Sequence, residues 1–79
     1  MPRDSKYRAR AESALGGALT AEKTFPEAEP LLLDAYRILS VQEKASIHCK
    51  RSRQRIVDLY KAWGKPAKAV QYQKLADAS

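Results

Sequence analysis

Two short stretches of this chain hold residue types that could do chemistry: a His–Cys pair and the basic run after it. A catalytic Cys–His pair would also need an orienting group and an oxyanion hole, and zinc needs more ligands than His48 and Cys49. The sequence contains no glycine-rich phosphate loop and no paired catalytic carboxylates. We therefore predict no catalytic residue, no metal and no cofactor in a protein that is not an enzyme. His48 is expected to close a loop, and Cys49 to begin a helix.

The basic run Lys50–Arg55 is the strongest electrostatic feature of the sequence. On a helix, Arg51 and Arg55 lie one turn apart on one face, while Arg53 lies on another. Because the formal net charge is +6, any partner is expected to be acidic. The charge also permits phosphate contacts, but nucleic-acid modules usually add stacking aromatics, and here the aromatics follow apolar stripes or helix ends. The pattern favours a protein partner over nucleic acid.

Length and composition limit what can position these residues. A chain of 79 residues is one small domain, and its apolar residues are mainly Leu and Ala, which favours helices. The longest apolar stretch, Leu31–Leu33, is far shorter than the roughly 20 residues that span a bilayer. The start of the chain lacks the apolar part of a signal peptide, and one cysteine allows no internal disulfide. We expect a single all-α domain over residues 1–79, cytoplasmic and without a membrane segment.

Apolar residues at steps of three and four predict four helices with clear start and stop signals. Asp4 or Ser5 can cap the first helix, Thr24-Phe25-Pro26-Glu27 is a good start for the second, and Gly64 ends the third. The helices are expected over residues 5–22, 26–43, 49–63 and 66–77.

The connection between the second and third helices can be interpreted in three ways. One is a short loop near residues 44–48. Ser40 and Glu43 also form a capping box, which would move the break to Ser40. A third is one long helix over residues 26–62, which would let two chains exchange hairpins.

Glycines and apolar residues predict how the helices pack. Gly16 and Gly17 each cost a helix about 1 kcal/mol relative to Ala, which usually means that another backbone approaches closely. The expected core residues are Leu15, Leu19, Ala28, Leu32, Ala35, Tyr36, Ile56, Leu59, Tyr60 and Ala69.

The second half of the chain echoes the first at an offset of 41 residues. The pairs are Leu19 with Tyr60, Ala28 with Ala69, and Ala35 with Ala76. Self-similarity at such a period is typical of a helical solenoid. We predict two stacked antiparallel hairpins, over residues 5–43 and 49–77.

At these positions the chain resembles the tetratricopeptide repeat, whose usual period is about 34 residues. The longer offset looks like the extended repeats of kinesin light chains. The matching residues are Leu15-Gly16, Leu19, Ala28, Leu32 and Ala35 in the first copy, and Ile56, Tyr60, Gly64, Ala69 and Ala76 in the second.

Two phrases, at residues 28–33 and 59–66, are similar to the ends of repeat arrays that follow bacterial serine/threonine kinase domains. The chain has no kinase signature, so this resemblance implies no kinase chemistry. Three residues depart from the repeat pattern: Lys23 replaces a turn glycine, Val57 a small residue and Gln73 a bulky apolar one. A polar residue on the last helix suits a water-facing cap, which implies the end of an array and not a free-standing protein.

The resemblance implies a right-handed superhelical fragment that binds a protein or an acidic peptide in a concave groove. In the family, the first helix of each repeat lines that groove, here with Arg10, Ser13, Arg51, Gln54, Asp58 and Lys61. The partner-binding candidates are Arg10, Arg51, Gln54 and Lys61 from this set, together with Arg55, which shares a helix face with Arg51. Two alternatives stay open: a structural cap with no ligand of its own, and a homodimer formed through the exposed face of the first helix.

Overall fold

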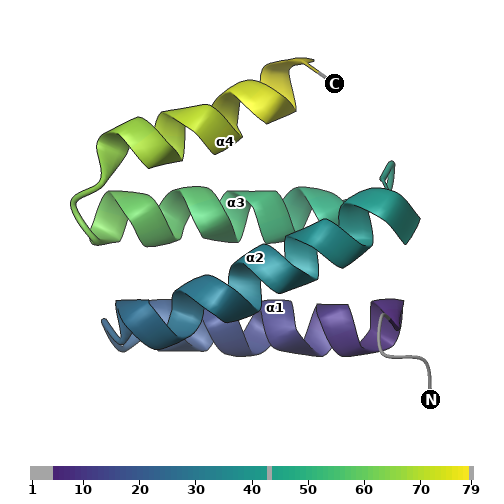
Figure 1. Ribbon diagram of the computed structural model, residues 1–79, viewed down its shortest axis with the longest axis horizontal. Helices are drawn as coiled ribbons and strands as arrows, with labels where there is room; N and C mark the ends of the chain where they lie inside the picture. The colour runs from purple at the N-terminus through teal and green to yellow at the C-terminus, as the bar shows by residue number, and fades with distance from the viewer. Residues whose placement is uncertain (1–4, 43, 79) are drawn as a thin grey trace.

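The computed structural model describes residues 5–42 and 44–78, with side chains up to Lys74. Within this part the chain has four helices and no strand: α1 (Lys6–Ala21), α2 (Phe25–Gln42), α3 (Ile47–Ala62) and α4 (Pro66–Ala78). They form two antiparallel hairpins, and α3 packs against both helices of the first hairpin as well as against α4 (Figure 1). The predicted all-α fold of two stacked hairpins is confirmed. None of the described helices is long and apolar enough to cross a membrane.

The second and third helices are separate, because Ser46 caps the start of α3. Its hydroxyl accepts a hydrogen bond of 3.3 Å from the N–H of Cys49. A break at Ser40 and a continuous helix over residues 26–62 are therefore both wrong, while Glu43 lies outside the described residues. His48 does not close a loop, as it was expected to do, but lies in the first turn of α3.

The two hairpins repeat the same local structure 41 residues apart. The helices α1 and α3 have 16 residues each, and each begins after a serine cap, Ser5 or Ser46. Ala28 and Ala69, matched by the offset, are 0% and 1% exposed and belong to one core cluster. The burial of Ala35 and Ala76, the third matched pair, is not compared, because the Ala76 side chain is outside the described part.

The turns of both hairpins are built alike. Lys23 and Gly64 follow the first helix of each hairpin with φ of 63° and 76°, in the left-handed region. The next N–H then bonds back to a helix carbonyl, at 2.9 Å from Thr24 and 2.8 Å from Lys65. This is a helix-closing motif that usually has glycine at the left-handed position. Lys23 adopts the same conformation despite its Cβ, so the first turn keeps the geometry of the second without its glycine.

The core agrees with the expected residues except at Leu15, which is 53% exposed. Its counterpart Ile56 is buried, because that face of α3 lies against the first hairpin, whereas no described helix covers the same face of α1. Leu19 and Tyr36 are partly buried at the edge of the core. The core also holds residues outside the expected set: Ala9, Ile38, Leu39, Cys49 and Val57.

Gly16 is the point of closest approach between α1 and α2. A Cβ built on it would lie 2.6 Å from both Cγ and Cδ2 of Leu32, and 3.5 Å from the carbonyl oxygen of Ala28. The expected close approach is present, although a side chain, and not a backbone, makes the tightest contact.

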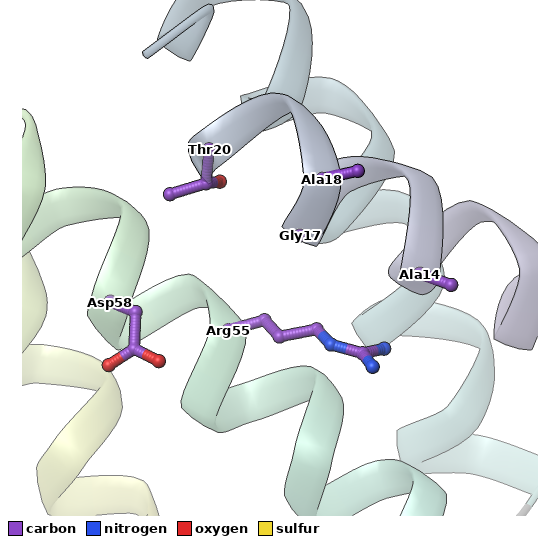
Figure 2. A pocket seen from close by; sticks show the side chains of 6 residues that line it. All are labelled: Ala14, Gly17, Ala18, Thr20, Arg55 and Asp58. Atoms are coloured by element: carbon purple, nitrogen blue, oxygen red, sulfur yellow. The ribbon is translucent and has the colours of Figure 1, made fainter. Parts of the chain in front are cut away.

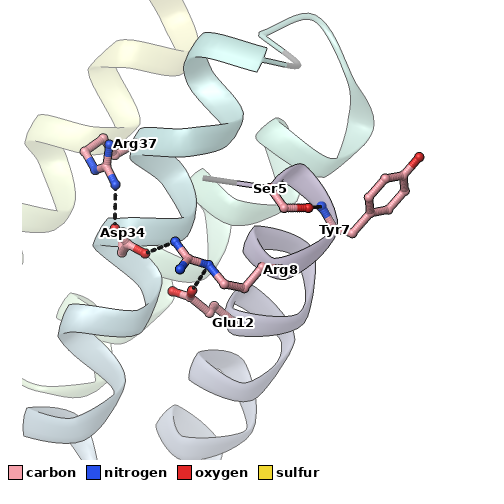
Figure 3. A network of polar contacts seen from close by, with 6 residues as sticks. All are labelled: Ser5, Tyr7, Arg8, Glu12, Asp34 and Arg37. Carbon is pink, nitrogen blue, oxygen red and sulfur yellow. Dashed lines mark hydrogen bonds and ion pairs between the residues drawn. The ribbon is translucent and has the colours of Figure 1, made fainter. Parts of the chain in front are cut away.

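A charged network also joins α1 to α2 (Figure 3). Arg37 donates to Asp34 at 2.9 Å, and Arg8 lies 3.0 Å from Glu12 and 3.5 Å from Asp34. The hydrogen bond from Arg37 holds the pKa of Asp34 below its usual value, whereas partial burial and the nearby Asp34 carboxylate raise the pKa of Glu12. These groups are partly exposed, so the network orients the hairpin more than it stabilises it.

Aromatic rings fill the space between the hairpins near their turns. The Trp63 ring stacks on Phe25 and on Tyr60, with centroids 5.8 Å and 6.4 Å apart. The Tyr60 hydroxyl donates to Glu29 on α2 at 2.9 Å. Burial, followed by this hydrogen bond to a carboxylate, raises the pKa of Tyr60. The contact ties α3 to α2 across the boundary between the two hairpins.

Candidate functional site

A groove runs between α1 and α3, formed by two adjoining hollows of about 320 Å³ and 210 Å³. Both are lined by Ala14 and Arg55, so we treat them as one feature, the α1–α3 groove. The larger hollow is lined by Ala14, Gly17, Ala18, Thr20, Arg55 and Asp58 (Figure 2). The smaller, basic hollow is lined by Arg10, Ser13, Ala14, Leu39, His48, Arg51 and Arg55.

The structure brings three of the five candidate residues together and leaves two outside. Arg10, from the first hairpin, and Arg51 and Arg55, from the second, line the basic hollow. Gln54 and Lys61 line neither hollow. The Gln54 amide instead donates to Asp58 on the next turn of α3, at 3.0 Å.

Arg55 is held in place by two features of α1. Its Nη1 donates to the hydroxyl of Ser13 at 2.8 Å, and Ser13 is only 2% exposed. Beside it, a Cβ on Gly17 would lie 3.3 Å from Nε and 3.4 Å from Cδ of Arg55. In Figure 2 the side chain accordingly extends from α3 across to α1 and ends beside Ala14. Gly17 therefore makes room for the arginine stem, and Ser13 fixes the direction of its guanidinium group.

The other two arginines are supported differently. The Arg10 guanidinium lies over the ring of Tyr7, 5.4 Å from its centroid, which is within the range of a cation–π contact. Arg51 is exposed and makes no hydrogen bond or ion pair with any described residue. Of the three guanidinium groups, that of Arg51 therefore has the most hydrogen-bonding capacity left for a ligand.

His48 is a groove residue that sequence reasoning missed. It precedes Arg51 by three residues and Arg55 by seven, so all three lie on one face of α3. The signal was present in the sequence, because Ser46 is a good helix cap whose position places His48 inside the helix.

Charge divides the groove into two ends. Asp58 lines the larger hollow, whereas no carboxylate described in the structure lines the basic hollow. Two small residues, Ala14 and Ala18, also line the larger hollow and leave space for a ligand backbone. The arrangement offers positive charge and hydrogen-bond donors at one end, and the Asp58 carboxylate at the other.

Other reactive groups in the described part lie away from the groove. The Cys49 thiol is 2% exposed in a core cluster with Ala9, Ile38 and Leu39. The Ser52 hydroxyl is fully buried and has no partner there. No group of three or more described His, Cys, Asp or Glu side chains is placed to hold a metal ion.

Comparison of this chain with family models, with curated proteins and with solved structures found no match.

Proposed function

We propose that this chain is a tetratricopeptide-like interaction module that binds an acidic peptide segment of a partner protein in the α1–α3 groove. The observation that carries the proposal is the convergence of Arg10, Arg51 and Arg55, from two hairpins, on one hollow. The sequence resemblance to tetratricopeptide repeats and the 41-residue repetition of the caps and turns also support it.

The charge pattern of the groove gives the ligand a direction. A carboxylate side chain suits the basic hollow, because guanidinium groups pair with carboxylates in bidentate geometry. The ligand backbone would cross the small residues Ala14 and Ala18. Asp58, at the other end, disfavours a second acidic residue and favours a Lys, an Arg or a free amide of the ligand.

The proposed function is binding alone, and it involves no catalysis, no cofactor and no metal. The hydroxyl in the basic hollow, that of Ser13, is bonded to Arg55 and is 2% exposed, so it is not placed as a nucleophile. A cytoplasmic setting belongs to the same proposal. It is supported by Cys49, the one cysteine of the sequence, which is buried and allows no internal disulfide of the kind that oxidising compartments favour.

Peptide binding by matched charge variants tests this function. Fluorescence anisotropy would measure the affinity of a degenerate library of acidic peptides for the native chain, for Arg51→Glu and for Arg53→Glu. Both variants change the net charge equally, but Arg53 lines neither hollow. We expect Arg51→Glu to abolish binding and Arg53→Glu to preserve most of it. Equal losses would mean that only overall charge matters, and the groove would be rejected as the site.

A second candidate function, self-association, is favoured by the outer face of α1. Leu15 and Tyr7 are 53% and 67% exposed there, and the Tyr7 ring points away from both helices of the hairpin (Figure 3). The matching residue Ile56, on α3, is buried because the first hairpin covers the equivalent face of that helix. A hairpin of a second molecule could cover the face of α1 in the same way. Sedimentation of the native chain and of Leu15→Lys at micromolar concentration separates the two functions. A dimer that Leu15→Lys dissociates would support self-association, and a monomer would exclude it in this range.

A further inference from the structure

The basic hollow carries more positive charge than one carboxylate group can balance. Three guanidinium groups line it, and His48 adds an imidazole, while no described carboxylate lies among the lining residues. A bound carboxylate brings a single negative charge. A phosphate monoester carries about −1.5 to −2 at pH 7, which matches the three arginines better.

The hydrogen bonds lead to the same ligand. A carboxylate has two oxygens and about four lone-pair sites, which one bidentate arginine and one further donor largely occupy. Arg51 is unpaired within the described part, and Arg55 uses only one of its N–H groups on Ser13. The remaining N–H groups of Arg51 and Arg55 alone are more donors than a carboxylate accepts. The three terminal oxygens of a phosphate monoester can accept from all of them.

The size of the hollow is suitable for such a group. Its volume of 210 Å³ corresponds to about seven waters at ~30 Å³ each, enough for a phosphoryl group and the carbon that carries it. Ala14 and Leu39 supply apolar wall beside the arginines, where that carbon would lie.

We infer that the basic hollow, lined by Arg10, Arg51 and Arg55, binds a phosphate monoester on the partner segment, such as a phosphoserine side chain. This inference rests on the proposed function and names the ligand group that the groove recognises. A phosphodiester of nucleic acid fits less well, because it has one negative charge and two free oxygens, as a carboxylate does. Recognition would depend on phosphorylation of the partner.

The test compares three peptide libraries that differ only at a fixed central residue: phosphoserine, Glu or Ser. Affinities would be measured by fluorescence anisotropy for the native chain, Arg51→Gln and Arg53→Gln, with a single-stranded oligothymidylate as the phosphodiester probe. We expect the phosphoserine library to bind the native chain at least about tenfold more tightly than the Glu library, because charge-assisted pairs outweigh ordinary ones. Arg51→Gln should remove this preference, and Arg53→Gln should retain it.

Inorganic phosphate gives a second measurement that needs no peptide. In NMR spectra at constant ionic strength, phosphate should shift the side-chain Nε–H signals of Arg51 and Arg55 clearly more than acetate at the same concentration. Equal shifts with both anions would contradict the inference.

The other outcomes are distinguishable from one another. Equal binding of the phosphoserine and Glu libraries would overturn the phosphate inference but leave the acidic-peptide function intact. Failure of all three libraries to bind would overturn both. Tighter binding of oligothymidylate than of the phosphoserine library, lost in Arg51→Gln, would replace the phosphopeptide with nucleic acid. Equal weakening of every library by Arg51→Gln and Arg53→Gln would reduce the effect to overall charge.

Discussion

Two adjacent glycines in α1 should respond in opposite ways to the same substitution. Gly16 faces Leu32 on α2, where an added methyl group would lie 2.6 Å from two carbon atoms of a fully buried side chain. Gly17 faces Arg55 across the groove, where the nearest atom, Nε, would be 3.3 Å away on a long side chain that need give way by only a few tenths of an ångström. Replacing either glycine with Ala removes the same helix penalty, so the difference between the variants isolates the contact.

The magnitude follows from two opposing terms. Ala in place of Gly stabilises a helix by about 1 kcal/mol. Forcing a methyl group into a packed core costs about 1–3 kcal/mol, because Leu32 cannot move without disturbing its neighbours. We expect Gly17→Ala to stabilise the fold by about 0.5–1 kcal/mol. Gly16→Ala should destabilise it by about 1 kcal/mol, which leaves the two variants about 2 kcal/mol apart.

Urea unfolding followed by circular dichroism at the helix band measures this difference. With a slope of about 1 kcal/mol/M for a chain of this size, the unfolding midpoints should differ by about 2 M. A second measurement identifies the cause: in a Leu32→Ala background, Gly16→Ala should become stabilising, because the clashing side chain is gone. Coincident midpoints, or a Gly16→Ala variant more stable than Gly17→Ala, would refute the packing argument.

Three further predictions concern the caps, the turns and one buried hydroxyl. Ser46→Ala should lower the free energy of unfolding by about 1 kcal/mol in urea titrations, because it removes the α3 cap, whereas Ser46→Asp should preserve it. Lys23→Gly should raise the free energy of unfolding by about 1 kcal/mol, because a φ of 63° is unfavourable for Lys and accessible to Gly. An unchanged urea midpoint would contradict this. Because the pKa of Tyr60 is raised in the folded state, its contribution is complete below pH ~10 and is lost as the pH rises above that value. Tyr60→Phe should therefore flatten the alkaline fall in stability seen by urea unfolding, and Tyr7→Phe, at an exposed tyrosine, should leave it unchanged.

The helices were predictable because their signals are local. Ser5 and Gly64 mark ends that lie within a residue or two of the predicted bounds. The break between α2 and α3 was harder, since no Gly or Pro marks it and Ser40 and Ser46 are both plausible caps in the sequence. The structure has Ser46 as the cap of α3, and with this start of the helix Cys49 is buried in the core.

The groove could be predicted in outline but not residue by residue. The helical face shared by Arg51 and Arg55 follows from spacing alone, and the two arginines do line one hollow. Gln54 lies outside both hollows and its amide donates to Asp58 along the same helix, a contact that spacing does not reveal. Leu15 was expected in the core because it lies on the apolar stripe of its helix, as Ile56 does 41 residues later. Ile56 is buried and Leu15 is exposed, because burial of a helix face depends on which elements pack against it, and the sequence of the helix alone does not show this.

The position of α4 at one flank of the structure has a consequence for how the chain opens. This helix packs along α3, and both walls of the groove belong to α1 and α3 (Figure 1). Fraying of α4 would therefore expose amide groups to solvent exchange without removing any residue that lines the groove. Hydrogen–deuterium exchange should show α4 as the least protected helix, with a local opening free energy well below that of α1 and α3. The recognition surface would in that case outlast the first stage of unfolding.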